Sequence, residues 1–188
     1  MFAVFVENAR NQAIEETVYR ATKFFFEREL PEVDNVVLTI RFESINVLNS
    51  NGVASVEDRN ENEYLIEIAK ERRFCYTLET LFHELTHLKQ FHEKRLEMDV
   101  EYFEIPEVPD DAAYFPELDP IDYVYWEGKP HPYNFRKWPL NSEQYNALPW
   151  EVEANTQMKI LYEEFGEYTR KDGKTDRIQE HTHGASRG

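Results

Sequence analysis

Hydrophobic and polar residues near the start of the chain repeat with a helical period. The apolar positions follow one another at steps of four, three and four: Ile14, Val18, Ala21 and Phe25. Residues with this spacing share one face of an α-helix. The pattern predicts an amphipathic helix over residues 8–30, with Asn8 as its N-cap and Pro31 directly after its end.

A period of two follows, in which apolar and polar residues alternate one by one. Residues 36–42 and residues 63–69 both show this alternation, so each segment is predicted to be a half-buried strand. Residues 49–52 are typical of a turn, and a short strand is predicted after it at residues 52–56. A further strand that ends in a turn is predicted at residues 123–128.

Two more helices are predicted from broad apolar stripes. One begins at about Thr77 as N-cap, and its stripe consists of Leu78, Leu81, Phe82, Leu85, Leu88 and Phe91. The other begins at Pro149, a residue favoured in the first helical turn, and ends near Tyr168. Its apolar face consists of Val152, Met158, Leu161, Tyr162 and Phe165.

These elements predict an α+β fold with a small mixed sheet of three to four strands packed on the N-terminal helix and the second helix. The chain has 188 residues, a length that suits one domain with one core. We expect that domain at residues 1–168 and a disordered polar tail at 169–188, which includes His181 and His183 as ordinary tail residues.

Residues 96–120 form an acidic insertion with nine acidic residues and no basic one. Four prolines interrupt it, so we expect an extended, partly irregular segment. Three roles fit such a segment: a solvated loop, a flank of a cleft that selects basic ligands, or an imitation of an acidic partner.

Overall charge and composition narrow the function classes. The formal net charge of −16 opposes binding to phosphate backbones, so a nucleic-acid partner is not expected. The single cysteine, Cys75, excludes an intrachain disulfide and is expected to be a buried, inert thiol. The chain starts without a signal-peptide pattern and contains no run of 18 apolar residues, so a cytoplasmic protein without a membrane span is expected.

The second predicted helix contains the sequence His83-Glu84-Leu85-Thr86-His87. Residues four apart lie one above the other on a helix, so His83 and His87 can bind one metal ion from a rigid backbone. Glu84 is rotated by about a quarter turn from His83 and can reach a metal-bound water without being a ligand. This pattern predicts a zinc site with Glu84 as the general base of a hydrolysis.

A catalytic zinc usually has three protein ligands, and the third is sought elsewhere in the chain. His92 follows His87 by five residues, whereas the known motif with a third histidine ligand needs six. On a continuing helix His92 would also point away from the pair, so it is interpreted as a surface residue. Glu151 is the better candidate because Asn155 shares its helix face and can accept the outer N–H of a ligand histidine. Glu153 is the alternative ligand, although it faces elsewhere and is expected to be a solvent-facing charge.

The HELTH helix, the strands before it and the later Pro149–Asn155 segment (PWEVEAN) together resemble zincin-type metallopeptidases whose third ligand is Glu. The combination is especially similar to compact metallopeptidases encoded by tailed phages, which are distantly related to SprT-like proteins. The resemblance covers residues 35–165, and the acidic insertion departs from it. It implies a zincin-like fold, one Zn²⁺ ion, a polypeptide substrate and, if phage-encoded, the host cytoplasm as location. In such a fold we expect the strand near residues 64–69 to be the edge strand of the substrate cleft, to which an extended substrate can add.

By this resemblance, His83, His87 and Glu151 are the metal ligands and Glu84 is the general base. A residue that stabilises the oxyanion is also expected. Tyr145 is the candidate, with Tyr133 and His131 as alternatives, although packing or surface roles suit each of the three as well. Two other functions remain open: a non-enzymatic interaction protein that uses the acidic insertion, and a zinc hydrolase of a non-peptide bond.

Overall fold

The computed structural model of this chain describes residues 2–48, 50–58, 62–101, 121–132 and 142–171. It is an α+β fold, which confirms the predicted class at that level. The chain divides into two compact units: unit 1 comprises Met1–Lys89 and Glu153–Gly188, and unit 2 comprises Gln90–Val152. The single domain expected at residues 1–168 stays a prediction. Among the described helices, none is long and apolar enough to pass through a membrane.

Unit 1 contains a four-stranded mixed sheet in the order β1-β2-β4-β3. Its strands are β1 (Phe2–Glu7), β2 (Val36–Glu43), β3 (Gly52–Asp58) and β4 (Glu63–Ala69). β1, β2 and β4 are parallel, whereas β3 pairs with β4 in the antiparallel direction. Buried and half-buried residues alternate along the whole of β2, as the period of two predicts for a strand with one face on the core.

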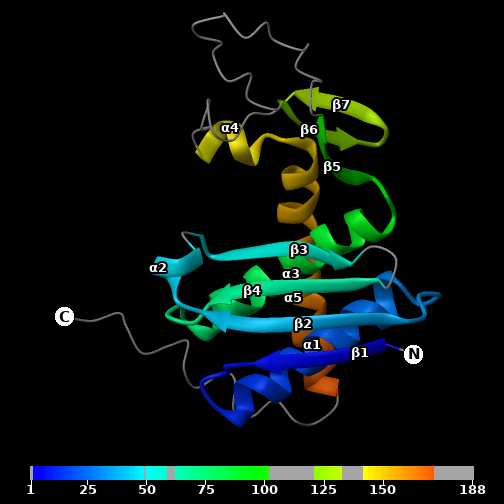
Figure 1. The fold of residues 1–188 in the computed structure, drawn as a ribbon. Coiled ribbons are helices and arrows are strands. Elements are labelled where there is room, and N and C mark those ends of the chain that lie inside the picture. Colours follow the sequence, from blue (N-terminus) through cyan, green and yellow to red (C-terminus); the bar gives the residue numbers. More distant parts are fainter. Residues whose placement is uncertain (1, 49, 59–61, 102–120, 133–141, 172–188) are drawn as a thin grey trace, which may run out of the picture. The chain divides into compact units, whose positions relative to one another are not determined.

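Helices cover one face of this sheet (Figure 1). They are α1 (Gln12–Glu29), α3 (Phe74–His92) and the larger part of α5 (Pro149–Lys171). The rings of Phe24, Phe82 and Phe165 meet pairwise at 5.6–6.3 Å between centroids, so the three helices share one aromatic core. Ion pairs from Lys89 and Arg28 to glutamates on neighbouring helices add to this packing at its rim.

The strand order corrects one prediction about the sheet. β4, the strand near residues 64–69, was expected to be the edge strand of a substrate cleft, but it lies between β2 and β3. The edge strand on that side is β3. β1 was not predicted at all, because a short apolar segment gives no local sign of the parallel partner that it finds after α1.

Several helix boundaries also differ from the prediction. α1 begins at Gln12 because the side chain of Asn11 accepts a hydrogen bond from the N–H of Ile14 at 3.0 Å, whereas Asn8 has a left-handed φ of 58° and is not the cap. α3 begins at Phe74 rather than near Thr77. A short helix, α2 (Ile45–Leu48), was not predicted.

The end of the last helix differs too. α5 continues to Lys171, and Thr169 in its last turn is buried, so residues 169–171 do not belong to a disordered tail. The expected disorder of residues 172–188, including His181 and His183, lies outside the described residues.

Unit 2 contains a three-stranded antiparallel sheet in the order β5-β6-β7. Its elements are β5 (Leu96–Glu101), β6 (Ile121–Trp126), β7 (Lys129–Pro132) and the short helix α4 (Ser142–Asn146). Glu127 and Gly128, both with positive φ, form the tight turn between β6 and β7. The start of the acidic insertion is therefore a regular strand, and its remainder at 102–120 lies outside the described residues.

Candidate metal centre

The two histidines of the HELTH sequence face each other in the middle of α3. Their Nε2 atoms are 3.0 Å apart, and their rings are nearly perpendicular with centroids 4.7 Å apart. His83 is half-buried and His87 is buried. The spacing of four residues on one helix thus brings both imidazoles to one point, as the sequence predicts.

The residues between the histidines explain why this helix segment is stable inside the protein. Leu85 is fully buried in the core, and the buried hydroxyl of Thr86 donates to the carbonyl oxygen of Phe82 at 2.8 Å. Glu84 is also buried, with 6% of its surface exposed. Polar groups at this depth require partners, and the helix backbone supplies the one for Thr86.

Glu151 lies in the first turn of α5 and completes a cluster with the two histidines. One ligand atom from each of His83, His87 and Glu151 lies within 4.8 Å of the other two. The third ligand predicted from the PWEVEAN segment is therefore the residue that joins the histidines.

The burial of Glu151 suits a metal ligand. Its exposed fraction is 2%, and its Oε2 atom is buried with no hydrogen-bond donor among the described residues, while the side chain makes other interactions. An ionised carboxylate is costly to bury unless it is paired or coordinates a metal. Its place in the first turn of α5 also favours a negative charge, because the N-terminal end of a helix dipole is positive.

The donor set is of a kind that binds divalent metals, zinc among them. Two imidazole nitrogens and one carboxylate oxygen are a common ligand set of catalytic zinc, which leaves a fourth position for water. Ligand atoms about 2.1 Å from a tetrahedral zinc lie about 3.4 Å apart. The nitrogens of His83 and His87 are already near that separation, and the whole cluster needs to close by no more than about 1.4 Å.

Glu84 lies against the start of the edge strand. A Cβ atom built on Gly52, the first residue of β3, would be 2.9 Å from Oε1 of Glu84. The carboxylate predicted to be the general base is therefore held between α3 and the edge of the sheet.

Gln90 lies one turn after His87 in α3, and no role was predicted for it from the sequence. Its side chain is fully buried, and its Nε2 donates a hydrogen bond of 3.1 Å to the carbonyl oxygen of Trp150. That carbonyl directly precedes Glu151 in α5. Gln90 thus ties α3 to the helix turn that carries the third candidate ligand.

Replacing Gln90 by Leu is expected to weaken zinc binding by roughly tenfold, the lower end of the range for residues that support metal ligands. The change keeps the volume and removes the donor to Trp150, so the first turn of α5 loses a tether. Titration against a chromophoric chelator measures the affinity. Gln157→Leu, the same change at a half-buried position of α5, is the control and should bind zinc normally. Equal affinity in both variants would contradict the role of Gln90.

The structure separates the other candidate ligands from the cluster. Among the described residues, the group able to hold a metal does not include His92 or Glu153. His92 ends α3 in a half-buried position, and Glu153 is half-buried on α5. Asn155 is half-buried one turn after Glu151, and no described hydrogen bond joins its side chain to a histidine.

The oxyanion residue remains a prediction. Tyr145 is exposed on α4, at 38% of its surface. The ring of His131 packs edge-on against Trp150 at 5.6 Å between centroids, which favours the alternative of a packing role. Tyr133 lies outside the described residues.

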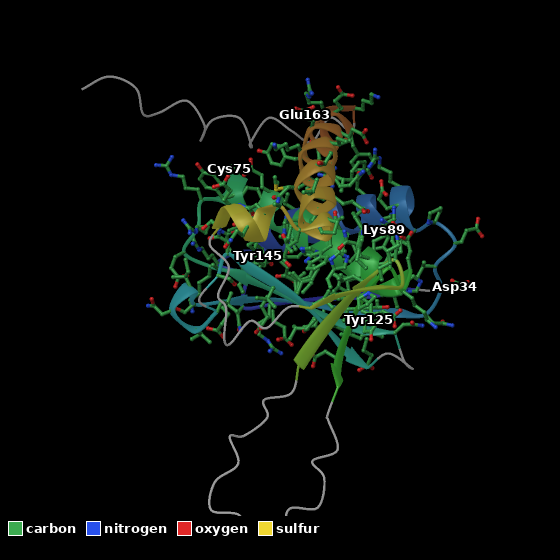
Figure 2. The ribbon with its side chains drawn as sticks, turned by 90° about the horizontal axis from the view of Figure 1, so that it is seen from above. Asp34, Cys75, Lys89, Tyr125, Tyr145 and Glu163 are labelled. Atoms are coloured by element: carbon green, nitrogen blue, oxygen red, sulfur yellow. The ribbon has the colours of Figure 1, made fainter. Side chains whose placement is uncertain are left out.

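Cys75 lies in the first turn of α3, and Lys89 lies near the other end of this helix (Figure 2). The thiol is half-buried rather than buried as predicted. Burial raises the pKa of Tyr162 on α5, and the charges of Cys75 and Glu79 add to that rise. Cys75 lies about two turns and Glu79 about one turn before His83 in α3.

Comparison of the chain with protein-family models, with curated proteins and with solved structures gave no significant match.

Proposed function

We propose that this protein is a zincin-type, zinc-dependent peptidase with His83, His87 and Glu151 as metal ligands and Glu84 as general base. The observation that carries the proposal is the convergence of one ligand atom from each of these three residues to within 4.8 Å. The resemblance of the HELTH and PWEVEAN segments to Glu-ligand zincins supports the same assignment.

The roles of the residues follow from their chemistry. Zinc, when bound, polarises the peptide carbonyl and lowers the pKa of water to about 7. Glu84 takes a proton from the attacking water as the bond to the carbonyl carbon forms. The same carboxyl group then gives that proton to the departing nitrogen as the C–N bond breaks. His83, His87 and Glu151 would hold the zinc ion, the two histidines from α3 and the glutamate from the first turn of α5.

A polypeptide substrate suits the edge of the sheet beside Glu84. β3 pairs on one side with β4 and is the last strand in the sheet order. An edge strand offers backbone N–H and C=O groups to which an extended segment can add. Because Glu84 is in contact range of Gly52 at the start of β3, a segment bound along β3 would pass close to the proposed base.

Zinc content and proteolysis of the full-length chain test the proposal together. We expect one zinc ion per chain, cleavage of an unstructured polypeptide, loss of cleavage with a chelator, and recovery when zinc is returned. Mass spectrometry of the products would identify the cleaved bonds. Zinc binding without any cleavage would contradict peptidase activity and favour an interaction protein or a hydrolase of another bond. Absence of zinc binding would contradict the metal centre itself.

A further inference from the structure

Gly52, the first residue of β3, is in a position that a side chain cannot occupy. A Cβ atom built there would lie 2.5 Å from Cγ2 of Thr80, 2.9 Å from Oε1 of Glu84 and 3.0 Å from Cγ of Glu84. Carbon atoms in proteins do not approach so closely, because attraction changes to steep repulsion below about 3.5 Å. Gly128 and Gly166 have no atom within 4 Å of the corresponding position.

The backbone conformation does not explain this glycine. Among the described glycines, the one with positive φ is Gly128, so the conformation of Gly52 is open to other residues. What requires glycine at position 52 is the space that Thr80 and Glu84 take up.

The strand is also held in place at this position. Gly52 pairs with Ile68 of β4, and its carbonyl oxygen accepts a hydrogen bond of 3.0 Å from the hydroxyl of Ser50. The carbonyl oxygen of Asn51 accepts from the N–H of Ala69 at 2.9 Å. A new side chain would therefore press on α3 before it displaced the strand.

On α3, the side chains of Thr80 and Glu84 differ in how easily they can move away from a new Cβ atom. Thr80 is β-branched and stiff on a helix, whereas the long side chain of Glu84 can rotate. Glu84 is nevertheless buried, so a rotation moves its carboxylate to a different place within a packed region. A displacement of about 1 Å in a reacting group can slow an enzyme by about a hundredfold.

We infer that Gly52 is a positioning residue for Glu84. Because Gly52 has no side chain, the start of the edge strand leaves free the space that the Glu84 carboxylate must occupy. This inference rests on the proposed function for its catalytic consequence. Its structural part, that residue 52 and the side chain of Glu84 share one space, stands on the contacts alone.

Gly52→Ala in the full-length chain tests the inference. We expect kcat for peptide cleavage to fall roughly tenfold to a hundredfold, with KM and zinc content unchanged. Because the contact with Thr80 can also impair folding, the same change is made in a Thr80→Ser background, which removes Cγ2 and keeps the hydroxyl. Gly52→Ala/Thr80→Ser should fold and keep the low kcat, whereas Thr80→Ser alone should not lower it.

A measurement without substrate separates the inference from the proposed function. In the Thr80→Ser background, Gly52→Ala should lower the melting temperature of the metal-free chain. This decrease should largely disappear when Glu84 is also replaced by Ala, since the two groups no longer compete. Gly166→Ala, at an open position of α5, is the matched control and should leave activity and melting temperature at or above the wild-type values.

The outcomes are distinct. If the wild type cleaves and Gly52→Ala/Thr80→Ser has the same kcat, the positioning role is refuted and the peptidase remains. If the decrease in melting temperature is equal with and without the Glu84 side chain, the shared space is refuted. If the zinc-loaded wild type cleaves nothing, the proposed function fails, and the melting temperatures still decide whether Gly52 sets the position of Glu84.

Discussion

Replacing Glu84 by Gln is expected to lower kcat/KM for peptide cleavage by roughly 10²- to 10⁴-fold while zinc content stays at the wild-type value. The amide has nearly the shape of the carboxylate but cannot accept a proton from water. Glu84 stands next to His83 in α3 and is absent from the cluster of metal-ligand atoms, so zinc affinity should not depend on its charge.

The comparison needs a control that changes the same functional group in the same helix. Glu79→Gln provides it, because Glu79 is half-buried in α3, more than one turn before the histidines. Both variants are assayed for zinc content and for cleavage of the same unstructured polypeptide at saturating and limiting substrate. Equal activity of Glu84→Gln and the wild type would refute the general base. A joint loss of zinc and activity would instead assign Glu84 to the metal.

The helices and strands that a local hydrophobic pattern defines on its own were predicted correctly. β2 and β4 alternate because one face of each is buried, and the face of α1 containing Val18, Ala21 and Phe25 is buried as its period requires. The histidine pair was predictable for the same reason, because the spacing from His83 to His87 is a property of one helix.

Features that depend on distant partners were not predictable in this way. β4 was wrongly expected at the sheet edge, because no local pattern indicates that β3 pairs on its outer side. β1 becomes a strand by pairing with β2 across α1. Asn8 and Asn11 are equally suitable N-caps by type, and only the fold decides that Asn11 bonds to Ile14.

Within the candidate site, too, local patterns indicated some residues, whereas others acquire their role from residues distant in sequence. Glu151 was a candidate because Pro149 predicts a helix start and the following Glu and Asn share a face. Gln90 and Gly52 had no such sign, since a buried amide and a glycine acquire their roles from Trp150 and Glu84, which are far from them in sequence. Gln90 does lie between Leu88 and Phe91 of the apolar stripe of this helix, and a polar residue on a buried helix needs a partner.

Replacing Glu151 by Ala is expected to weaken zinc binding by more than about a hundredfold. Changes in residues that merely support metal ligands cost about 10- to 100-fold in affinity, so the loss of one of three ligands should exceed that range. Glu151 is 2% exposed and belongs to the cluster with His83 and His87, so its loss would leave two imidazoles to hold the ion. Peptide cleavage should disappear at zinc concentrations that saturate the wild type.

Glu153→Ala is the matched control for this variant, because it removes the same group two residues later in the same helix. A chain that binds zinc only in its folded state gains thermal stability in proportion to the logarithm of zinc concentration over Kd. The zinc-dependent rise in melting temperature should therefore remain in Glu153→Ala and shrink sharply in Glu151→Ala. If the two variants exchanged these results, Glu153 would be the ligand. If both variants behaved like the wild type, His83, His87 and Glu151 would lie within 4.8 Å of one another without forming a three-ligand metal centre.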